Sequence, residues 1–268
     1  MRTVAHISDL HFGAETPTVA DALVRELHDV EPSLVVISGD FTQRARRAQF
    51  AAARAYLQRL PAPRLCVPGN HDVPLYDVVR RAFFPLQRYR AFIDREVNPV
   101  YRDDQLLVVG LNSARSATWK NGRISAEQME KLERHLDGAR HQAKVVVTHH
   151  PFLPPPDDVG IELVGRAART VEVLDRCGVD LLLAGHLHRG YAGDIRTQYP
   201  AARRAIVSAQ AGTAISHRLR GSDVNNYNLI RLSPDRMEIE VRAWNGTRFA
   251  PLRVSPFHRM ADGWHGVT

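Results

Sequence analysis

Five short polar clusters, rich in carboxylate, imidazole and amide side chains, recur along the sequence. They are Asp9-Leu10-His11, Gly39-Asp40, Gly69-Asn70-His71-Asp72, Thr148-His149-His150 and Gly185-His186-Leu187-His188. Such side chains, without thiolates, suit borderline or hard divalent cations such as Mn, Fe, Zn or Mg. The clusters therefore predict binding of divalent metal, and they leave the identity of the metal open because one ligand set serves several ions.

Each cluster directly follows an apolar run that is typical of a β-strand. The runs are residues 4–8, 34–38, 65–67, 145–147 and 181–184. Residues 19–30 and 45–60 lie between the first three runs and have helical character, which predicts parallel strands joined by helical crossovers. Ligands of α/β sheets bind at the carboxyl ends of the strands, so we expect the five clusters to converge at one edge.

Two neighbouring cations need a shared ligand. An aspartate can provide one because each of its two oxygens can face a different cation, and Asp40 stands alone after the strand at 34–38. Asp40 is therefore our candidate for the bridging ligand. Glycines 39, 69 and 185 fit a backbone that turns sharply to aim the ligands.

The pattern changes after His188, where no strong helical pattern follows. Short strand candidates recur at 204–208, 227–232 and 237–243, which predicts a mostly antiparallel sheet packed against the first half. No repeat or low-complexity linker separates the two halves. We therefore predict one α/β domain over residues 1–268, with an α/β part at about 1–190, a β-rich part at about 191–250 and a tail at 251–268.

The motifs D-x-H, G-D, G-N-H-D, H and G-H-x-H, in this order, resemble those of the calcineurin-like metallophosphoesterase superfamily. They span Asp9 to His188, and five of them in order after five strands form a specific signal, although each alone is weak. The resemblance implies a four-layer α/β/β/α sandwich of two mixed sheets. It also implies hydrolysis of a phosphoric ester by a hydroxide that bridges two divalent cations.

The resemblance also implies a role for each matching residue. One cation takes Asp9, His11, Asp40 and His188, and the other takes Asp40, Asn70, His149 and His186. His71 matches the family's non-ligand histidine, which contacts the phosphate or the leaving oxygen, and Asp72 is expected to orient it. His150 either supports the metal ligands as a neighbouring partner or only packs in the protein.

Within the superfamily, the spacing and length look most like bacterial class III phosphodiesterases, which act on 3′,5′-cyclic nucleotides, or like enzymes acting on glycerophosphodiesters. Residues 210–213, followed by Arg218 and Arg220, also resemble that group. Asn70, His71 and the two arginines are therefore the candidate substrate-binding residues. The expected substrate is a small anionic phosphodiester.

Three alternative functions stay open. A UDP-acylsugar pyrophosphatase would need an apolar surface insertion, for which only residues 73–97 are a candidate, and their apolar residues fit helical core spacing equally well. Those residues are Val78, Val79, Phe83, Phe84 and Phe92. A nuclease is disfavoured because no aromatic and basic stacking platform is found. A non-catalytic interaction module would bind no metal.

Composition limits the partners and the compartment. The net charge is +7, but the arginines look scattered, so a nucleic-acid partner is not expected. Cys66 and Cys177 cannot build a disulfide framework, and we find no signal peptide or membrane span. These features favour a cytoplasmic protein. The tail at 251–268 either contacts its own domain or joins a partner subunit in a homodimer.

Overall fold

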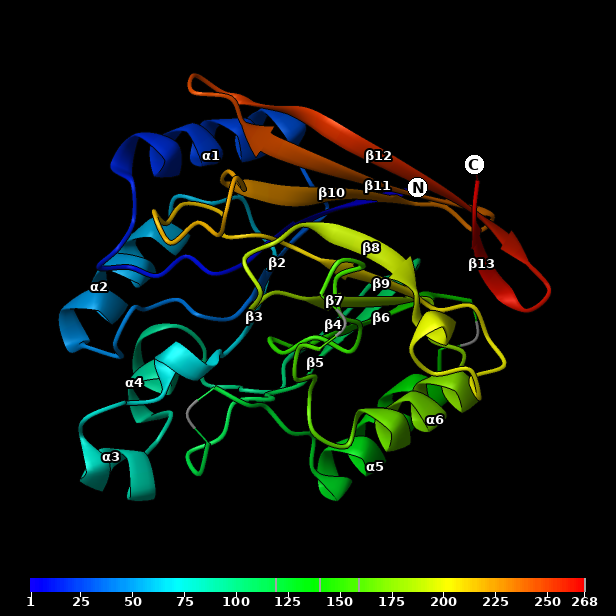
Figure 1. Cartoon of the computed structure of the whole chain (residues 1–268), viewed down its shortest axis with the longest axis horizontal. Coiled ribbons are helices and arrows are strands. Elements are labelled where there is room, and N and C mark those ends of the chain that lie inside the picture. Colours follow the sequence, from blue (N-terminus) through cyan, green and yellow to red (C-terminus); the bar gives the residue numbers. More distant parts are fainter. Residues whose placement is uncertain (119, 140, 159, 268) are drawn as a thin grey trace.

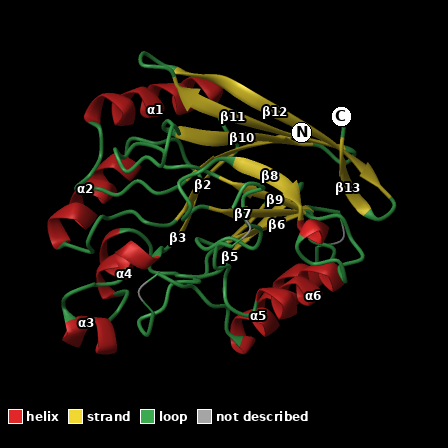
Figure 2. Cartoon of the chain, viewed as in Figure 1, coloured by secondary structure: helices red, strands yellow, loops and turns green. Residues whose placement is uncertain are grey.

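Two β-sheets stacked face to face form the centre of the molecule, with helices on the outer face of each (Figure 1, Figure 2). The computed structural model describes residues 1–118, 120–139, 141–158 and 160–267. The strand order is β13-β12-β11-β10-β1-β2-β3 in one sheet and β4-β5-β6-β7-β9-β8 in the other. Both sheets contain parallel and antiparallel pairs, which confirms the four-layer sandwich of two mixed sheets.

The first sheet begins with a parallel unit that contains the first three polar clusters. Its parallel strands are β1 (Arg2–Ile7), β2 (Leu34–Ser38) and β3 (Arg64–Val67), joined by α1 (Pro17–Val30) and α2 (Arg47–Leu57). An antiparallel series continues the sheet from the other edge of β1. Its strands are β10 (Asn226–Leu232), β11 (Arg236–Trp244), β12 (Phe249–Met260) and β13 (Gly263–Gly266). Residues 251–266 therefore pack on their own domain as strands of this sheet.

The second sheet has a parallel centre and antiparallel edges. Its central strands are β5 (Leu106–Gly110), β6 (Ala143–Val147), β7 (Leu181–Ala184) and β9 (Val207–Gln210), and its edges are β4 (Val100–Arg102) and β8 (Tyr191–Asp194). The outer face is covered by α5 (Ala126–Asp137) and α6 (Ala167–Cys177), and a short helix η2 (Ile195–Thr197) follows β8. The strand predicted at 204–208 corresponds to β9, which pairs parallel with β7. It also pairs antiparallel with β8, so the expectation of antiparallel pairing is confirmed for one neighbour of this strand and wrong for the other.

Three clusters of buried apolar side chains hold the helices and sheets together. Val36 of β2 and Val145 of β6 belong to the middle layer, between the sheets. Leu23 anchors α1 to the first sheet, and Leu174 anchors α6 to the second. Alternate residues of a strand face opposite layers, so both faces of the central strands are buried and the strands read as continuous apolar runs.

Two short helices stand at one corner of the molecule, beyond the edge of the sheets (Figure 1). They are α3 (Val78–Phe83) and α4 (Gln87–Phe92), and they follow the single turn η1 (Asn70–Asp72). The interpretation that the apolar residues of 73–97 belong to the core is confirmed for Phe92, which packs against the core around α2. It is wrong for Val78, Val79, Phe83 and Phe84, which are 55–73% exposed. None of the described helices combines the length and the apolar character needed to cross a bilayer.

Candidate metal centre

All five polar clusters meet where β1, β2 and β3 of one sheet and β6 and β7 of the other sheet end. A first group of ligand atoms comes from Asp9, His11 and His188, which lie within 4.8 Å of one another. The Nε2 atoms of His11 and His188 are 3.1 Å apart. Asp9 Oδ1 lies 3.5 Å from the first nitrogen and 3.2 Å from the second. All three side chains are buried.

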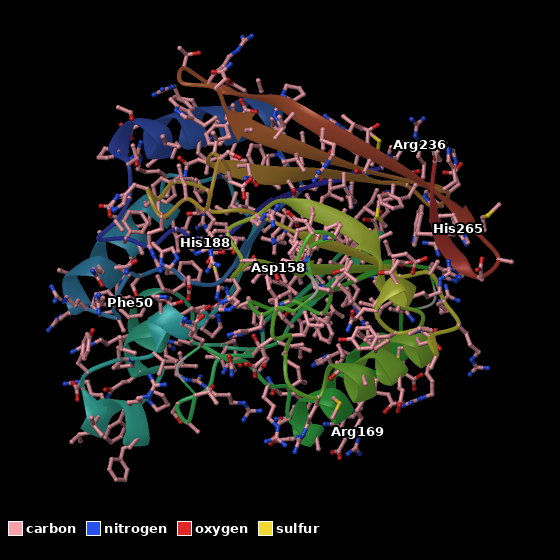
Figure 3. The ribbon with its side chains drawn as sticks, in the orientation of Figure 1. Phe50, Asp158, Arg169, His188, Arg236 and His265 are labelled. Carbon is pink, nitrogen blue, oxygen red and sulfur yellow. The ribbon has the colours of Figure 1, made fainter. Side chains whose placement is uncertain are left out.

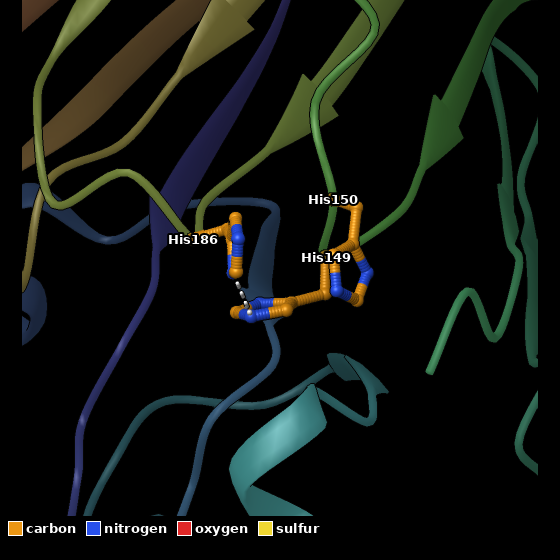
Figure 4. Close-up of side chains that lie close together, drawn as sticks. All are labelled: His149, His150 and His186. Carbon is orange, nitrogen blue, oxygen red and sulfur yellow. Dashed lines mark hydrogen bonds between the residues drawn. The ribbon is translucent and has the colours of Figure 1, made fainter. Parts of the chain in front are cut away.

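A second group joins the end of β3 to the ends of β6 and β7. Asn70 Oδ1 lies 3.1 Å from His149 Nε2 and 3.1 Å from His186 Nδ1. The two ring nitrogens are 3.3 Å apart, and the rings of His149 and His186 meet edge to face (Figure 4). This group therefore offers two imidazole nitrogens and one amide oxygen to the same small space.

Asp40 lies between the two groups. Its Oδ2 atom is 3.6 Å from His11 Nε2 in the first group and 3.4 Å from His149 Nε2 in the second. Its Oδ1 atom accepts a hydrogen bond of 2.8 Å from the backbone N–H of His71. A single oxygen thus faces both groups, in contrast to the expectation that each oxygen would face one cation.

Backbone carbonyls fix the tautomers of two of these imidazoles. His149 donates from Nδ1 to the Ser38 carbonyl at 2.7 Å, and His188 donates from Nδ1 to the Arg218 carbonyl at 2.5 Å. When neutral, both rings therefore present an unprotonated Nε2 to the site. Histidines that ligate metals are usually held in this way.

The donor atoms fit divalent cations. Among the described residues, buried Asp9 Oδ1 has no hydrogen-bond partner, although the unprotonated Nε2 of neutral His188 lies 3.2 Å from it. Two acceptors that face each other at this distance repel unless a positive charge lies between them. Burial lowers the pKa of His188, but Asp9 outweighs burial and raises it, so the charge is either a proton on His188 or a cation that displaces this proton. Nitrogen and oxygen donors without sulfur suit Mn, Fe, Zn or Mg.

Most of the protonation states also suit metal binding. Burial alone would raise the pKa of Asp9 and Asp40, but neighbouring histidines hold both pKa values below the ordinary value, so both groups are carboxylates. Burial and His149 lower the pKa of His186 to about 3. Burial lowers the pKa of His149 as well, but Asp40 outweighs it and raises that pKa to about 9. A cation bound there must therefore displace a proton from His149.

The backbone of the site is strained. Five of the candidate ligands have positive φ angles, which residues other than glycine rarely adopt. These are Asp9 (53°), His11 (47°), Asp40 (53°), His186 (74°) and His188 (59°). Such strain concentrates at functional sites, where the surrounding structure holds the backbone in place.

Glycines allow the strand ends to approach one another. Gly39 has a φ of 94°, in agreement with a sharp turn. Glycine is needed at position 185 for a different reason. A Cβ there would lie 1.8 Å from Ser8 Oγ and 2.5 Å from Asp9 Oδ2. The absence of a side chain at Gly185 thus brings the end of β7 against the end of β1.

Replacing Gly185 with alanine is expected to displace Asp9 or His186 and to lower the rate of the phosphoric ester hydrolysis that the motifs imply by about 100-fold, the cost of misplacing a catalytic group by ~1 Å. Metal content and turnover of an aryl phosphodiester measure the effect. Gly138→Ala is the control, because a Cβ at Gly138 meets no described atom within 4 Å and its φ is −81°. Equal metal content and rate in the two variants would contradict the close-packing argument.

Asp72 was expected to orient His71, but its carboxylate has other partners. Its carboxylate accepts hydrogen bonds from the backbone N–H groups of Gly69, Phe41 and Thr42, and from the Thr42 hydroxyl. Its role is therefore to fasten the loop after β2 to the loop after β3. The His71 ring is oriented by the Gln43 carbonyl, which accepts from Nδ1 at 2.8 Å. Burial and the charge of Asp40 raise the pKa of Asp72 to about 7.

Both nitrogens of the His150 ring are occupied by other partners. Nε2 donates to the Lys120 carbonyl at 2.7 Å, so in the neutral ring Nδ1 accepts from the Ser113 hydroxyl at 2.7 Å. The ring packs 4.6 Å from that of His186, between centroids (Figure 4). His150 therefore holds the loop around Lys120 beside the site, which leaves His149 as the better candidate ligand.

The two candidate arginines differ in position. Arg218 Nη1 lies 3.2 Å from His71 Nε2 and 3.3 Å from His11 Nε2, at the mouth of the first group. Arg220 is exposed, and its side chain makes no ion pair or hydrogen bond with any described residue. The structure thus brings Arg218 to the site and leaves Arg220 outside it.

Several residues that shape the site were missed by sequence reasoning. The Ser8 hydroxyl donates to Asp9 Oδ2 at 2.6 Å, and the Thr213 hydroxyl donates to the Asp9 carbonyl at 2.6 Å. The carbonyls of Ser38 and Gln43 orient histidines. Any residue type can supply a carbonyl, so these positions carry no sequence signal. Thr213 lies in residues 210–213, a segment already noted for its resemblance to the phosphodiesterases.

Comparison with known proteins identifies relatives named as cyclic nucleotide phosphodiesterases. The chain is similar to a probable cyclic nucleotide phosphodiesterase of Synechococcus, with 25% identity over 70% of this chain and 74% of the relative. It is also similar to the 3′,5′-cyclic adenosine monophosphate phosphodiesterase CpdA of Escherichia coli, with 26% identity over 88% of this chain and 77% of that protein.

The fold also matches that of solved structures. A dimetal phosphatase from Danio rerio superposes with a TM-score of 0.67 and 15% identity, and the match covers 93% of this chain and 98% of that one. The family model that describes calcineurin-like phosphoesterases matches residues 2–190, which include every candidate ligand. The chain therefore belongs to the calcineurin-like phosphoesterase family.

Proposed function

We propose that this chain is a phosphodiesterase that hydrolyses a small phosphodiester, such as a 3′,5′-cyclic nucleotide, with the help of two divalent cations. The observation that carries the proposal is the position of Asp40, whose Oδ2 atom faces imidazole nitrogens of both groups at 3.4–3.6 Å. The names of the Synechococcus and Escherichia coli relatives support a cyclic nucleotide as the substrate class.

The two groups divide the candidate ligands between the two cations. Asp9, His11, Asp40 and His188 would hold one, and Asp40, Asn70, His149 and His186 would hold the other. When bound, two such cations supply water activation and neutralisation of phosphoryl charge. The protein contributes rigid ligands, because strained backbone and carbonyl contacts fix their directions.

Arg218 is suited to bind the phosphoryl group. Its guanidinium has no carboxylate partner among the described residues and lies at the mouth of the first group. A guanidinium offers paired donors that match two oxygens of a phosphate. Its own carbonyl orients His188, so phosphate binding and ligand orientation depend on the same loop.

His71 is suited to protonate the leaving oxygen. When neutral, its ring has the proton on Nδ1, because that atom donates to the Gln43 carbonyl. Nε2 therefore faces the site, where it accepts from Arg218 Nη1 at 3.2 Å. Once Arg218 turns to the phosphate, Nε2 is free to hold a second proton for transfer. An alkoxide needs such a proton to leave, because it is a strong base.

The test is hydrolysis of bis-p-nitrophenyl phosphate and 3′,5′-cyclic AMP by metal-free protein, before and after addition of Mn. We expect turnover only with metal, and a rate lower by about 100-fold or more in Asn70→Ala. Substituting a residue that only supports a metal ligand already lowers metal affinity or activity by about 10–100-fold. Asn245→Ala, in the exposed turn between β11 and β12, is the matched control. Turnover without metal, or an unchanged rate in Asn70→Ala, would contradict the proposal.

One observation favours a second candidate, the UDP-acylsugar pyrophosphatase. That activity needs an apolar insertion, and Val78, Val79 and Phe83 of α3 are exposed. Cleavage of a UDP-linked acylated sugar by the metal-loaded protein, without cleavage of cyclic AMP, would select this candidate. The reverse result would select the phosphodiesterase.

A further inference from the structure

The positive charge of the chain is concentrated in one segment. Residues 44–97 contain eleven arginines and four carboxylates, a net charge of +7, which equals the net charge of the whole chain. The remaining residues are therefore neutral in sum. This contradicts the interpretation that the arginines are scattered. The segment forms α2, β3, η1, α3 and α4, and its helices lie together on one side of the molecule (Figure 1).

The same segment carries the densest group of exposed apolar side chains. Of thirteen large exposed hydrophobic residues in the described part of the chain, five lie within residues 76–84. They are Tyr76 (71% exposed), Val78 (71%), Val79 (67%), Phe83 (73%) and Phe84 (55%). Since α3 stands at a corner of the molecule (Figure 1), neither sheet can cover these side chains.

Arginines border this apolar tip. Arg44 Nη1 donates to the Tyr76 hydroxyl at 2.6 Å, and its guanidinium lies 5.3 Å from the centre of that ring. Arg47 lies 6.0 Å from the centre of the Phe92 ring on α4. Arg80 is on α3 itself, and Arg90 is exposed on α4. We call the five apolar residues and these four arginines the α3 surface.

We propose that the α3 surface docks on an anionic phospholipid bilayer. Exposed valine and phenylalanine side chains favour the boundary between headgroups and acyl chains, and arginines around them favour lipid phosphates. Charge complementarity selects an anionic bilayer over a neutral one. A nucleic acid would use the arginines but would leave Val78, Val79 and Phe83 in water.

Docking through this surface would bring the metal centre close to the bilayer. Only five residues separate Asp72, the end of η1, from Val78, the start of α3, and Arg44 follows directly after Gln43, which orients His71. A substrate formed at or released from a membrane would thus meet the site at its source. The proposal concerns the surface alone and does not depend on which phosphodiester is cleaved.

The test is sedimentation of the full chain with vesicles of phosphatidylcholine alone, and of phosphatidylcholine with one third phosphatidylglycerol. We expect binding to the anionic vesicles only, weakened by added salt because exposed charges are screened. Val79→Ser with Phe83→Ser should weaken binding by about tenfold or more. Arg47→Gln with Arg90→Gln should weaken it by about fivefold for each arginine.

Controls change residues of the same kinds, an exposed apolar pair and an exposed arginine, on the opposite side of the molecule. Leu252→Ser with Val254→Ser alters exposed apolar residues of β12, and Arg236→Gln alters an exposed arginine of β11 (Figure 3). Both controls should bind as the parent does. Absence of binding, equal binding to neutral vesicles, or equal loss in the controls would overturn the proposal. So would a dimer in solution that Val79→Ser with Phe83→Ser converts to monomer, since the occupant would then be a second copy.

Discussion

Replacing Asp40 with asparagine is expected to lower kcat/KM for bis-p-nitrophenyl phosphate by about 1,000-fold or more, because metal cations supply several kcal/mol of transition-state stabilisation. Asp40 Oδ2 faces both groups of candidate ligands, at 3.4–3.6 Å from nitrogens of His11 and His149. Asparagine keeps the shape but loses the charge. Metal content, measured by atomic emission after equilibration with Mn, should fall below two ions per chain.

The asparagine carbonyl can still accept from the His71 N–H, as Asp40 Oδ1 does, so we expect the variant to fold. Asp180→Asn is the control for loss of a buried carboxylate. Asp180 precedes β7 at the end remote from the site, where it accepts from the Trp264 indole at 2.9 Å. This control should lower the melting temperature and keep both metal ions. If Asp40→Asn retained two ions and the parent rate, Asp40 would not be the shared ligand.

The candidate site was predictable because its residues follow strands. An apolar run that ends in Asp-x-His or Gly-Asp specifies both an element and the edge at which the side chain emerges, so convergence followed from the parallel pairing of β1, β2 and β3. The same reasoning failed for Asp72, because the number of backbone donors around a carboxylate depends on neighbouring loops. Here these are the loops after β2 and β3.

Strand pairing was less predictable than strand position. The strand near residue 205 was expected, and its antiparallel partner β8 lies nearby in the sequence, but 22 residues separate it from its parallel partner β7. Local sequence does not specify that choice. In α3, six residues give fewer than two helical turns, so periodicity could not distinguish a core face from an exposed tip. The surplus of arginines in 44–97 was present in the sequence and is visible only when charge is counted by segment.

Replacing His71 with alanine is expected to slow hydrolysis of 3′,5′-cyclic AMP by about 10²–10⁴-fold, the usual contribution of a general acid. The effect on bis-p-nitrophenyl phosphate should be much smaller, because p-nitrophenolate leaves without a proton. The prediction depends on His71 Nε2, which faces the site since Nδ1 donates to the Gln43 carbonyl. Parallel kcat measurements on the two substrates give the difference.

Metal content separates this role from that of a ligand, because His71 Nε2 lies near ligand atoms of His11 and Asp40. A general acid can be removed without loss of either cation, whereas a ligand cannot. His135→Ala, an exposed histidine of α5, controls for loss of an imidazole and should change neither rate. Equal slowing on both substrates, accompanied by loss of one cation, would show that His71 is a ligand. Another group would then have to protonate the leaving oxygen.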